Sequence, residues 1–360
     1  KEATKLKARL LINTDSYREA VSLLDGLGEL DAQTEEVYQK VTLARGMELY
    51  KARNLKGAIE LFDKCASKRS NMDFNAQSRF WKAETLMLMG EEAAATQAYQ
   101  DFLDQPSATS TEMYPYAYYG LGYMKFQQKK YDEAASNFSR FTTQAAQGRY
   151  DERMVHDGYL RLGDCNFMTK QLTESVKAYA YVTGKKGTDA DYALYQSGLI
   201  YGLLTKSEEK VTTMKRLITD FPNSRFVVDA YFECAEEYMV MGRSAEAEKY
   251  YGDILQKFPN NPKANRAYAT LGRIYYNNNK LSNAVEVYSK LYDNYPGTPE
   301  ATEAVSTARL VYMDMGKVDD YASWVRTLDF VQVTDAELDN DTYEVAEKQY
   351  LQNNIKQTYQ

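Results

Sequence analysis

Residues 265–298 read NRAYATLGRIYYNNNKLSNAVEVYSKLYDNYPGT and contain two helical patterns separated by three asparagines. The first pattern places residues at i, i+3, i+4 and i+7, which is one face of a helix. Its members are Tyr268, Leu271, Gly272 and Tyr275, and those of the second pattern are Ala284, Tyr288 and Leu291. The asparagines favour a helix end, because asparagine tolerates the left-handed backbone found there. The stretch therefore predicts two short helices joined by a tight turn.

The same unit recurs along the chain. Prolines at positions 222, 259 and 296 are 37 residues apart, and each follows an aromatic residue. A fixed period of this size indicates stacked structural repeats that share a continuous core. The pattern predicts repeats at 1–34, 39–72, 76–109, 115–148, 156–189, 191–224, 228–261, 265–298 and 301–334, with an incomplete repeat or a capping helix at 341–360. We therefore expect one all-α solenoid of antiparallel helix pairs over residues 1–360, with about nine repeats and a partial tenth.

Some positions within the repeats lead to further expectations. Gly272 and Ala284 are small, which we attribute to a close crossing of the two helices. Lys210 stands where other repeats have a small residue, so the pattern does not fix the start of that helix. Residues 144–153 form a polar connection, and the aromatic-proline stop is missing near 184–188, where we expect a flexible point.

The C-terminal end has two capping-box spacings, Thr334…Glu337 and Asp341…Glu344. After them, Val345, Ala346, Gln349 and Tyr350 have the spacing of another first helix. The chain ends before a second helix could follow, and natural solenoids end in polar capping helices. We therefore expect a fragment of a longer protein, with a single capping helix over 341–360 as the alternative.

The anchors of the unit resemble those of the tetratricopeptide repeat (TPR) family. The pattern W-x2-L-G-x2-Y…A-x3-F…P is matched by Tyr268-x2-Leu271-Gly272-x2-Tyr275, then Ala284-x3-Tyr288, then Pro296, with Tyr in place of Trp and Phe. The resemblance covers nearly the whole chain and implies a right-handed superhelical solenoid.

The joins between repeats resemble those of bacterial envelope TPR proteins, namely the outer-membrane assembly lipoproteins and the TolA-binding protein. The resemblance rests on Phe221-Pro222-Asn223-Ser224 and Phe258-Pro259-Asn260-Asn261. It implies a periplasmic or outer-membrane-associated protein, attached through a missing N-terminus, with a cytoplasmic location as the alternative.

Composition and motifs disfavour several classes of function. A net charge of −7 argues against nucleic acid, whose binding requires neutralisation of phosphates by Lys and Arg. No apolar run is long enough to span a membrane. The cysteines Cys65, Cys165 and Cys234 are scattered and are expected to be packed apolar residues, and His156 is the only histidine. Phosphate loops and hydrolase motifs are absent, so we expect no enzyme, no cofactor and no metal.

The chain has 32 tyrosines, more than the repeat anchors require. In TPR proteins, the second, fifth, ninth and twelfth positions of each first helix tend to face partners in a concave groove. Carried onto this chain, the resemblance implies partner-facing aromatics at Tyr116, Tyr119, Tyr123, Phe126, Phe167, Tyr192 and Tyr195, and a cationic stretch at Arg266, Arg273 and Arg309. Helical spacing supports the stripe at 116, 119, 123 and 126, which is distinct from the core stripe at 118, 121 and 122. The alternative is that these aromatics pack against the next repeat or a crossing loop.

The leading hypothesis is a non-enzymatic scaffold that holds an extended peptide or a partner domain in an aromatic groove. The Lys and Asn residues of chaperone-type TPR clamps are missing, so an acidic C-terminal peptide is not the expected ligand. One alternative is a polymer- or carbohydrate-binding solenoid that uses Asp157, Asp164 and Glu84 beside the rings. Another is the repeat region of a larger multidomain protein, with an enzymatic domain elsewhere.

Overall fold

A computed structural model describes residues 2–12, 16–145, 150–185 and 187–358. Every regular element in these ranges is a helix, as the sequence predicts. The chain divides into two compact units, Lys1–Gly187 and Thr188–Gln360. The division lies within the segment 184–188, where a flexible point is expected. Residue 186 and the part of the polar connection at 146–149 lie outside the described residues.

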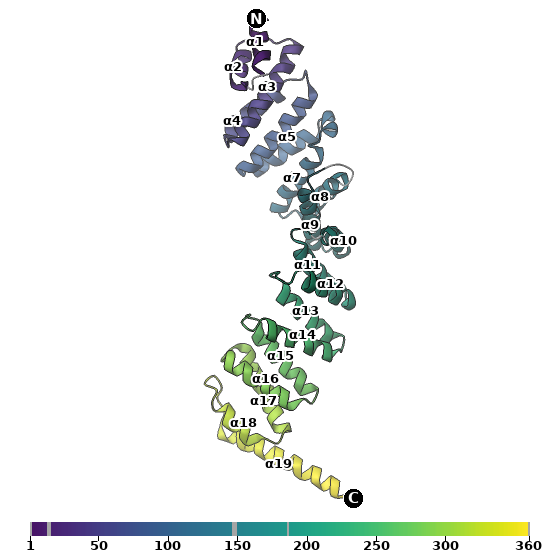
Figure 1. The fold of residues 1–360 in the computed structure, drawn as a ribbon, viewed down its shortest axis with the longest axis vertical. Coiled ribbons are helices and arrows are strands. Elements are labelled where there is room, and N and C mark those ends of the chain that lie inside the picture. The colour runs from purple at the N-terminus through teal and green to yellow at the C-terminus, as the bar shows by residue number, and fades with distance from the viewer. Residues whose placement is uncertain (1, 13–15, 146–149, 186, 359–360) are drawn as a thin grey trace. The chain divides into compact units, whose positions relative to one another are not determined.

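The first unit consists of helix pairs that follow one another in chain order (Figure 1). The pairs are α1 (Glu2–Ile12) with α2 (Tyr17–Asp25), α3 (Ala32–Lys51) with α4 (Leu55–Ala66), α5 (Met72–Met89) with α6 (Glu92–Leu103), α7 (Tyr114–Gln127) with α8 (Tyr131–Ala145), and α9 (Glu152–Met168) with α10 (Leu172–Lys185). A short 3-10 helix, η1 (Pro106–Ser110), lies between α6 and α7. Each α-helix contacts the next one along the chain.

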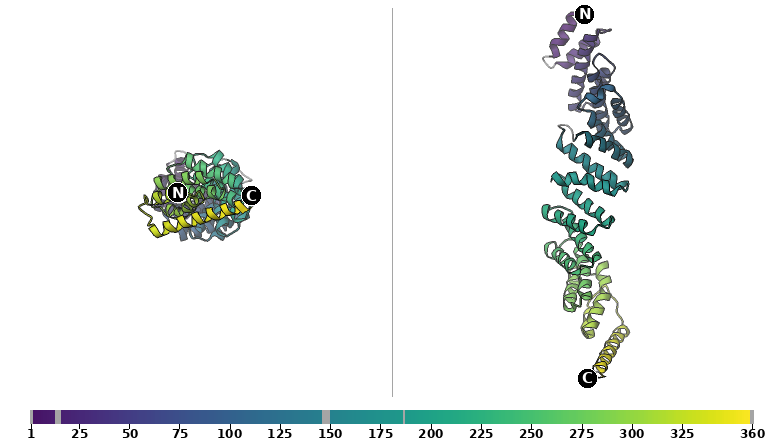
Figure 2. Two further views of the ribbon diagram at one scale, coloured as in Figure 1. Left: turned by 90° about the horizontal axis from the view of Figure 1, so that it is seen from below. Right: turned by 90° about the vertical axis from the view of Figure 1, so that its right-hand side faces the viewer.

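The second unit repeats this arrangement, as Figure 2 also shows. Its pairs are α11 (Ala190–Leu203) with α12 (Ser207–Asp220), α13 (Val227–Val240) with α14 (Ser244–Lys257), α15 (Ala264–Asn277) with α16 (Leu281–Asn294), and α17 (Pro299–Asp314) with α18 (Val318–Val325), followed by α19 (Asp335–Thr358). Successive helices are again in contact.

The turn inside a helix pair depends on one residue with left-handed backbone. In the pair α15–α16 this residue is Asn279, with a φ of 57°, which confirms the expected helix stop. The corresponding residues in seven other pairs are Arg53, Gly90, Lys129, Lys170, Thr205, Gly242 and Gly316. The positive φ ends the first helix and lets the second run back along it.

The aromatic-proline joins end the second helices in one common conformation. Phe221, Phe258 and Tyr295 have φ values of −133°, −132° and −136° and ψ values of 61°, 50° and 51°. A residue before proline is driven out of the helical region because the proline ring clashes with it. The period of 37 residues in the sequence therefore marks the same structural event three times.

From the sequence, we attribute the small size of Gly272, at the centre of α15, to a close crossing of two helices. The structure gives a more specific reason, namely one side chain of α16 that packs against this glycine. A Cβ added to Gly272 would lie 2.5 Å from the ring of Tyr288 on α16. In four other pairs, a large side chain of the second helix likewise packs against a glycine of the first helix. These contacts are Gly46–Phe62, Gly122–Phe138, Gly163–Tyr179 and Gly198–Met214. In these five pairs the glycine thus accommodates a large buried side chain from the second helix.

Two helix starts differ from the sequence expectation. α3 begins at Ala32 rather than near residue 39, because the side chain of Asp31 accepts a hydrogen bond from the Thr34 amide and caps the helix there. The capping box of Thr334 and Glu337 is confirmed, since each residue binds the backbone amide of the other. The second expected box, at Asp341, is wrong: α19 runs through this position, and the Asp341 side chain is buried at 1% exposure.

Candidate functional site: an aromatic cavity between two first helices

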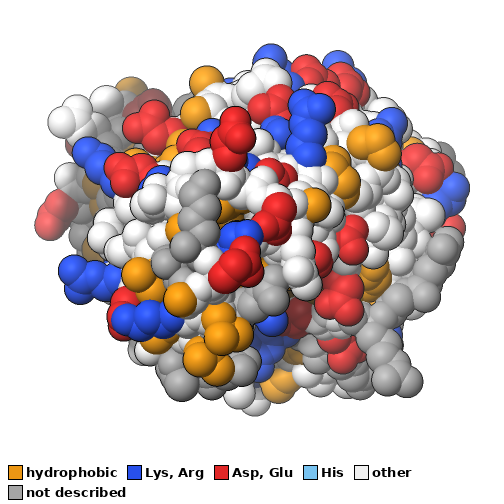
Figure 3. Space-filling model, turned by 90° about the horizontal axis from the view of Figure 1, so that it is seen from above, with side chains coloured by type: hydrophobic (Ala, Val, Ile, Leu, Met, Phe, Trp, Pro, Cys, Tyr) orange, Lys and Arg blue, Asp and Glu red, His pale blue; other side chains and the backbone are white. Residues whose placement is uncertain are grey.

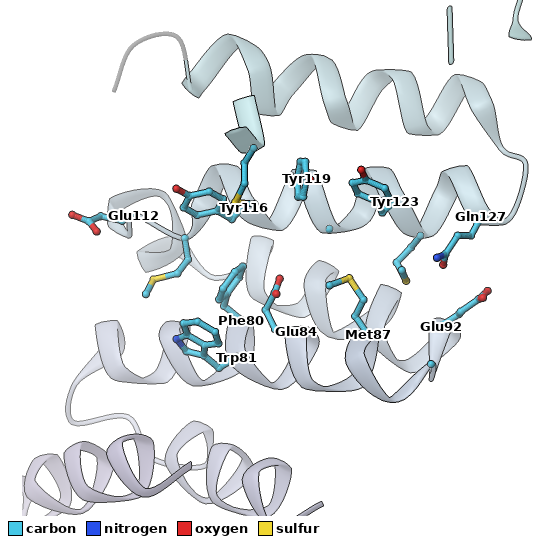
Figure 4. Close-up of a pocket in the computed structure, with 15 residues that line it drawn as sticks. Phe80, Trp81, Glu84, Met87, Glu92, Glu112, Tyr116, Tyr119, Tyr123 and Gln127 are labelled. Carbon is cyan, nitrogen blue, oxygen red and sulfur yellow. The ribbon is translucent and has the colours of Figure 1, made fainter. Parts of the chain in front are cut away.

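The first unit contains a cavity of about 610 Å³ between α5 and α7. α5 contributes Phe80, Trp81, Glu84 and Met87, and α7 contributes Tyr116, Tyr119, Gly120, Tyr123, Met124 and Gln127. The remaining lining residues are Gly90, Glu92, Glu112, Met113 and Met154. Figure 4 shows Phe80, Glu84 and Met87 directed from α5 towards α7, along which the three tyrosines follow one another. The cavity thus lies between the first helices of two successive repeats.

α7 separates its tyrosines into two faces. Tyr118 and Leu121 are buried in the hydrophobic core at 7% and 4% exposure. Tyr116, Tyr119 and Tyr123 are half-buried and line the cavity, as their different helical phase predicts. Three of the predicted partner-facing residues therefore lie together in one cavity.

Two of these tyrosines also bind the following repeat. The Tyr119 hydroxyl donates to Oδ2 of Asp157 on α9 at 2.8 Å, and the Tyr123 hydroxyl donates to the same oxygen. Nε of Arg161 lies 3.3 Å from both the Tyr123 hydroxyl and Oδ1 of Asp157. Tyr119 and Tyr123 therefore contact the next repeat, as the packing alternative expects, and they also line a cavity; that they face a partner stays a prediction.

Burial and the contact with Asp157 together favour the protonated form of the two tyrosines. Burial and the neighbouring Asp157 carboxylate raise the pKa of Tyr119 and of Tyr123 above the ordinary value. Both hydroxyls therefore stay protonated near neutral pH and continue to donate to Asp157. Since the hydroxyls are engaged, the rings are the parts of Tyr119 and Tyr123 that a ligand would contact.

Glu84 is the charged side chain that extends from α5 into the space between the two helices (Figure 4). Its Oε1 accepts a hydrogen bond of 2.6 Å from the hydroxyl of Tyr99, a buried residue of α6. A Cβ on Gly120 would lie 2.4 Å from the Tyr99 ring, so this glycine lets Tyr99 reach Glu84. Burial raises the pKa of Glu84, and the Tyr99 hydrogen bond opposes the rise only in part.

On the α5 side of the cavity, the sequence predicts only Glu84 as a ligand contact, in the carbohydrate alternative, and does not predict Phe80, Trp81 or Met87. Phe80, Glu84 and Met87 occupy the fifth, ninth and twelfth positions of the third repeat, so the rule that predicted the α7 tyrosines could have found them. Trp81 lies outside that rule; its ring packs 5.5 Å from Tyr50 and 5.4 Å from Phe80, measured between centroids. Trp81 lines the cavity because of how α5 packs against its neighbours, which the repeat positions do not specify.

The other two predicted aromatics of the first unit do not line the cavity. Phe126 packs against Tyr131 at the start of α8, with ring centroids 5.5 Å apart. Phe167 is half-buried near the end of α9. For Phe126 the packing alternative describes the structure better than a place in the cavity.

Tyr192 and Tyr195 belong to the second unit and contact the join that follows. The Tyr195 ring stacks on Phe226 with centroids 4.9 Å apart and an interplanar angle of 15°, and Tyr192 lies 6.0 Å from the same ring. The Arg225 guanidinium lies 4.6 Å from the Phe226 centroid. These tyrosines therefore help to hold α11 against the start of α13.

The predicted cationic stretch is interrupted by ion pairs within the chain. Arg309 binds Asp341 on α19 through two nitrogens, and Arg266 pairs with Glu236 on α13. Arg273 is exposed and forms no ion pair among the residues that the structure describes. It lines a polar cavity of about 390 Å³ together with Arg266, Glu300 and Glu303. Two of the three arginines thus have structural partners.

Lys210 has a structural explanation that the repeat pattern did not provide. Its ammonium lies 2.7 Å from Glu233 and 2.9 Å from Glu237, both on α13, and Ser207 also donates to Glu237. Burial alone would lower the pKa of Lys210, but the bonds to both carboxylates overcome this effect and raise it. Where other repeats have a small residue, Lys210 therefore forms ion pairs that connect α12 to α13 of the next repeat.

The three carboxylates considered for carbohydrate binding are already bound to tyrosine hydroxyls. Asp157 accepts from Tyr119 and Tyr123, Glu84 accepts from Tyr99, and Asp164 accepts from Tyr179 at 2.7 Å. Their role in the structure is therefore to join neighbouring helices.

Other chemistry is sparse in the described ranges. No group of three or more His, Cys, Asp or Glu side chains there could hold a metal ion. No helix in the described part of the chain is both long and apolar enough to cross a membrane. The three cysteines are free and fully buried, as expected for packed apolar residues. On the face drawn in Figure 3, acidic and basic side chains are interspersed.

Comparisons with known proteins agree with the repeat architecture. Family models described as tetratricopeptide repeat match residues 192–224 and 234–299. No curated protein matches the sequence. Among solved structures, the Naa15/Naa10 complex bound to HypK-THB has 11% identity and a TM-score of 0.52, over 96% of this chain and 51% of that chain.

Two further structures have lower TM-scores. The C-terminal part of a TPR repeat-containing protein from Cytophaga hutchinsonii has 15% identity and a TM-score of 0.47, over 73% of this chain and 98% of that one. YrrB, described as a TPR protein with an unusual peptide-binding site, has 18% identity and a TM-score of 0.44, over 58% of this chain and 98% of that one. The family matches and the helix-pair architecture together identify the chain as a protein that contains tetratricopeptide repeats.

Proposed function

We propose that this protein is a non-enzymatic scaffold that binds an extended peptide, or a segment of a partner domain, in the aromatic cavity between α5 and α7. The observation that carries the proposal is the lining itself. Trp81, Tyr116, Tyr119 and Tyr123 meet in one space of about 610 Å³, a size typical of ligand sites. Large, rather rigid aromatic side chains are favoured at protein interfaces because they bury much surface at little entropic cost.

The chemistry of the lining supports binding rather than catalysis. It contains aromatic residues, methionines, glycines, glutamates and one glutamine, and it has no serine, cysteine, histidine or lysine. Methionine adapts its shape to a bound surface, which suits the recognition of a peptide side chain. The cavity thus offers mainly apolar and aromatic area, and the groups in it that could transfer a proton are glutamates and tyrosines.

Carbohydrate binding is the weaker alternative. Sugar recognition needs polar groups beside each ring, and Asp157 and Asp164 already accept hydrogen bonds from tyrosines. A role as the repeat region of a larger multidomain protein is compatible with peptide binding, since the cavity lies wholly within the first unit.

For the compartment, we propose a periplasmic or outer-membrane-associated location, with the cytoplasm as the alternative. The support is the resemblance of the Phe-Pro-Asn joins to envelope proteins. Unpaired cysteines are unusual in an oxidising compartment such as the periplasm. The three free cysteines of this chain are buried, and inaccessible thiols are protected from forming disulfides there. Recovery of the native chain with a periplasmic marker on cell fractionation would support the location, and recovery with a cytosolic marker would contradict it.

The proposed binding is tested by selecting peptides from a random display library on the full chain. Affinities of enriched peptides are then measured by fluorescence anisotropy for the wild type and for Trp81→Ala and Tyr116→Ala. Neither substitution removes a hydrogen bond to Asp157. We expect each to weaken binding by about 2 kcal/mol, roughly thirtyfold, as for buried aromatic residues at interfaces.

Tyr343→Ala provides the matched control, because Tyr343 lies on α19 and is 66% exposed. It should leave the affinity unchanged, and circular dichroism should report the same helix content for all variants. Failure to enrich any peptide, or equal binding by the cavity variants and the control, would contradict the proposal.

A further inference from the structure

We infer that the cavity is selective for a basic peptide, in which a bulky apolar side chain is flanked by a lysine or arginine that pairs with Glu84. This inference rests on the proposed function and specifies the class of partner. Its basis is the charge of the lining, the position of Glu84 and the aromatic faces beside it.

The charged side chains of the lining all have one sign. Glu84, Glu92 and Glu112 line the cavity, whereas no lysine, arginine or histidine does. A peptide that enters an apolar cavity with acidic walls is favoured when it carries positive charge. Acidic peptides would place like charges together at a cost, so the wall charges discriminate between partners.

Glu84 has an oxygen available for a ligand. Oε1 accepts the Tyr99 hydroxyl, while no residue in the described ranges donates to Oε2. Burial raises the pKa of Glu84, and no neighbouring cation acts against this rise. The raised pKa favours the protonated form of Glu84 in the free protein, because the side chain lacks the counter-charge that partly buried carboxylates usually have. A ligand ammonium or guanidinium would supply this counter-charge and so favour the ionised carboxylate.

The aromatic rings near Glu84 can contact the methylene stem of a ligand lysine or arginine. Phe80, Trp81 and Tyr116 line the same cavity and offer aromatic surface. Lysine and arginine bury their methylene stems on apolar surface, and their cations are attracted to the faces of aromatic rings. The cavity can therefore hold an apolar anchor and the stem of a basic residue at the same time.

The C-terminal helix of a second copy is a poor occupant. α19 has an exposed apolar edge that includes Tyr343, Tyr350 and Leu351. Its charged residues are nonetheless mostly acidic, namely Asp335, Glu337, Asp339, Asp341, Glu344 and Glu347, against Lys348 and Lys356. Helix and cavity walls would repel each other, so charge complementarity favours a basic partner.

The inference is tested with peptides selected on the full chain from an unbiased library. We expect enrichment of lysine or arginine next to an aromatic or large aliphatic residue. One selected peptide is then synthesised in two forms, with the lysine (or arginine) retained or replaced by norleucine. Both forms are titrated against the wild type and Glu84→Gln, a variant that keeps the shape of the side chain and can still accept the Tyr99 hydrogen bond.

A double-mutant cycle separates the ion pair from other effects. We expect the norleucine form to bind the wild type about tenfold more weakly, because hydrogen bonds to charged groups are the stronger kind. In Glu84→Gln the two forms should bind nearly alike. Glu60→Gln is the matched control: Glu60 is exposed on α4 and does not line the cavity, so the lysine preference should survive.

The outcomes distinguish this inference from the proposed function. Enriched peptides without basic residues, or a lysine preference that persists in Glu84→Gln, would overturn the inference while leaving peptide binding intact. Enriched peptides that bind Trp81→Ala and Tyr116→Ala as well as the wild type would overturn both. Binding by an acidic peptide with the sequence of α19 would replace the basic partner with a second copy of this chain.

Discussion

At the scale of single residues, one glycine decides how the two helices fit in five of the helix pairs, at Gly46, Gly122, Gly163, Gly198 and Gly272. We predict that Gly272→Ala destabilises the protein by roughly 1–3 kcal/mol, because the added Cβ overpacks the core. That Cβ would lie 2.5 Å from the buried Tyr288 ring. Urea denaturation of the full chain measures the difference.

Gly252 supplies the control for this prediction. It lies inside α14, and nothing lies within 4 Å of a Cβ added there. Gly252→Ala should stabilise the protein by about 1 kcal/mol, since alanine favours the helix over glycine. If both substitutions change stability in the same direction and by a similar amount, the ring-insertion account is wrong.

The three thiols give a second prediction at this scale. Burial raises the pKa of Cys65 to about 11 and of Cys165 and Cys234 to about 12. The reactive thiolate is therefore scarce at about pH 8, and the native protein should react slowly with a thiol reagent, with all three cysteines reacting after unfolding. Fast reaction of even one cysteine in the native protein would contradict the structure.

At the scale of elements, the repeat template predicts most helices because their buried faces are periodic. Tyr268, Leu271 and Gly272 can be assigned from spacing alone, as can the left-handed turn at Asn279. The template misses the start of α3, because the Asp31 cap lies outside the repeated pattern. It also misassigns Asp341, since a capping-box spacing occurs inside helices as well as at their starts. An ion pair between the buried Asp341 and the partly exposed Arg309, which spacing does not reveal, determines the role of Asp341.

That ion pair supports a prediction about α19. Asp341 is 1% exposed and binds Arg309 of α17. Asp341→Ala leaves the guanidinium without its carboxylate, so α19 should detach more readily from α17. Hydrogen exchange should become faster in residues 335–345 and stay unchanged in α15. Asp339→Ala, at an exposed position of the same helix, is the control, and equal exchange in both variants would refute the role of the pair.

At the scale of the whole molecule, the sequence predicts the class of fold better than it predicts the site. The α7 tyrosines follow from the groove positions of the repeat. Their hydrogen bonds to Asp157, and the place of Trp81 and Glu84, depend on how separate repeats pack, which spacing within one repeat does not specify. The single solenoid over residues 1–360 remains a prediction, because each of the two compact units is defined by its own contacts.

Peptide binding in the α5–α7 cavity is the central claim, and Trp81 reports on it directly. The chain has two tryptophans, so Trp324→Phe leaves Trp81 as the only tryptophan emitter. The measurement is a titration of this variant with a selected peptide, followed by tryptophan emission. We predict a saturable change in the Trp81 emission, with the same midpoint as anisotropy gives. Unchanged Trp81 emission at saturating peptide, together with a change in the Trp324 emission of Trp81→Phe, would place the ligand elsewhere and contradict the account.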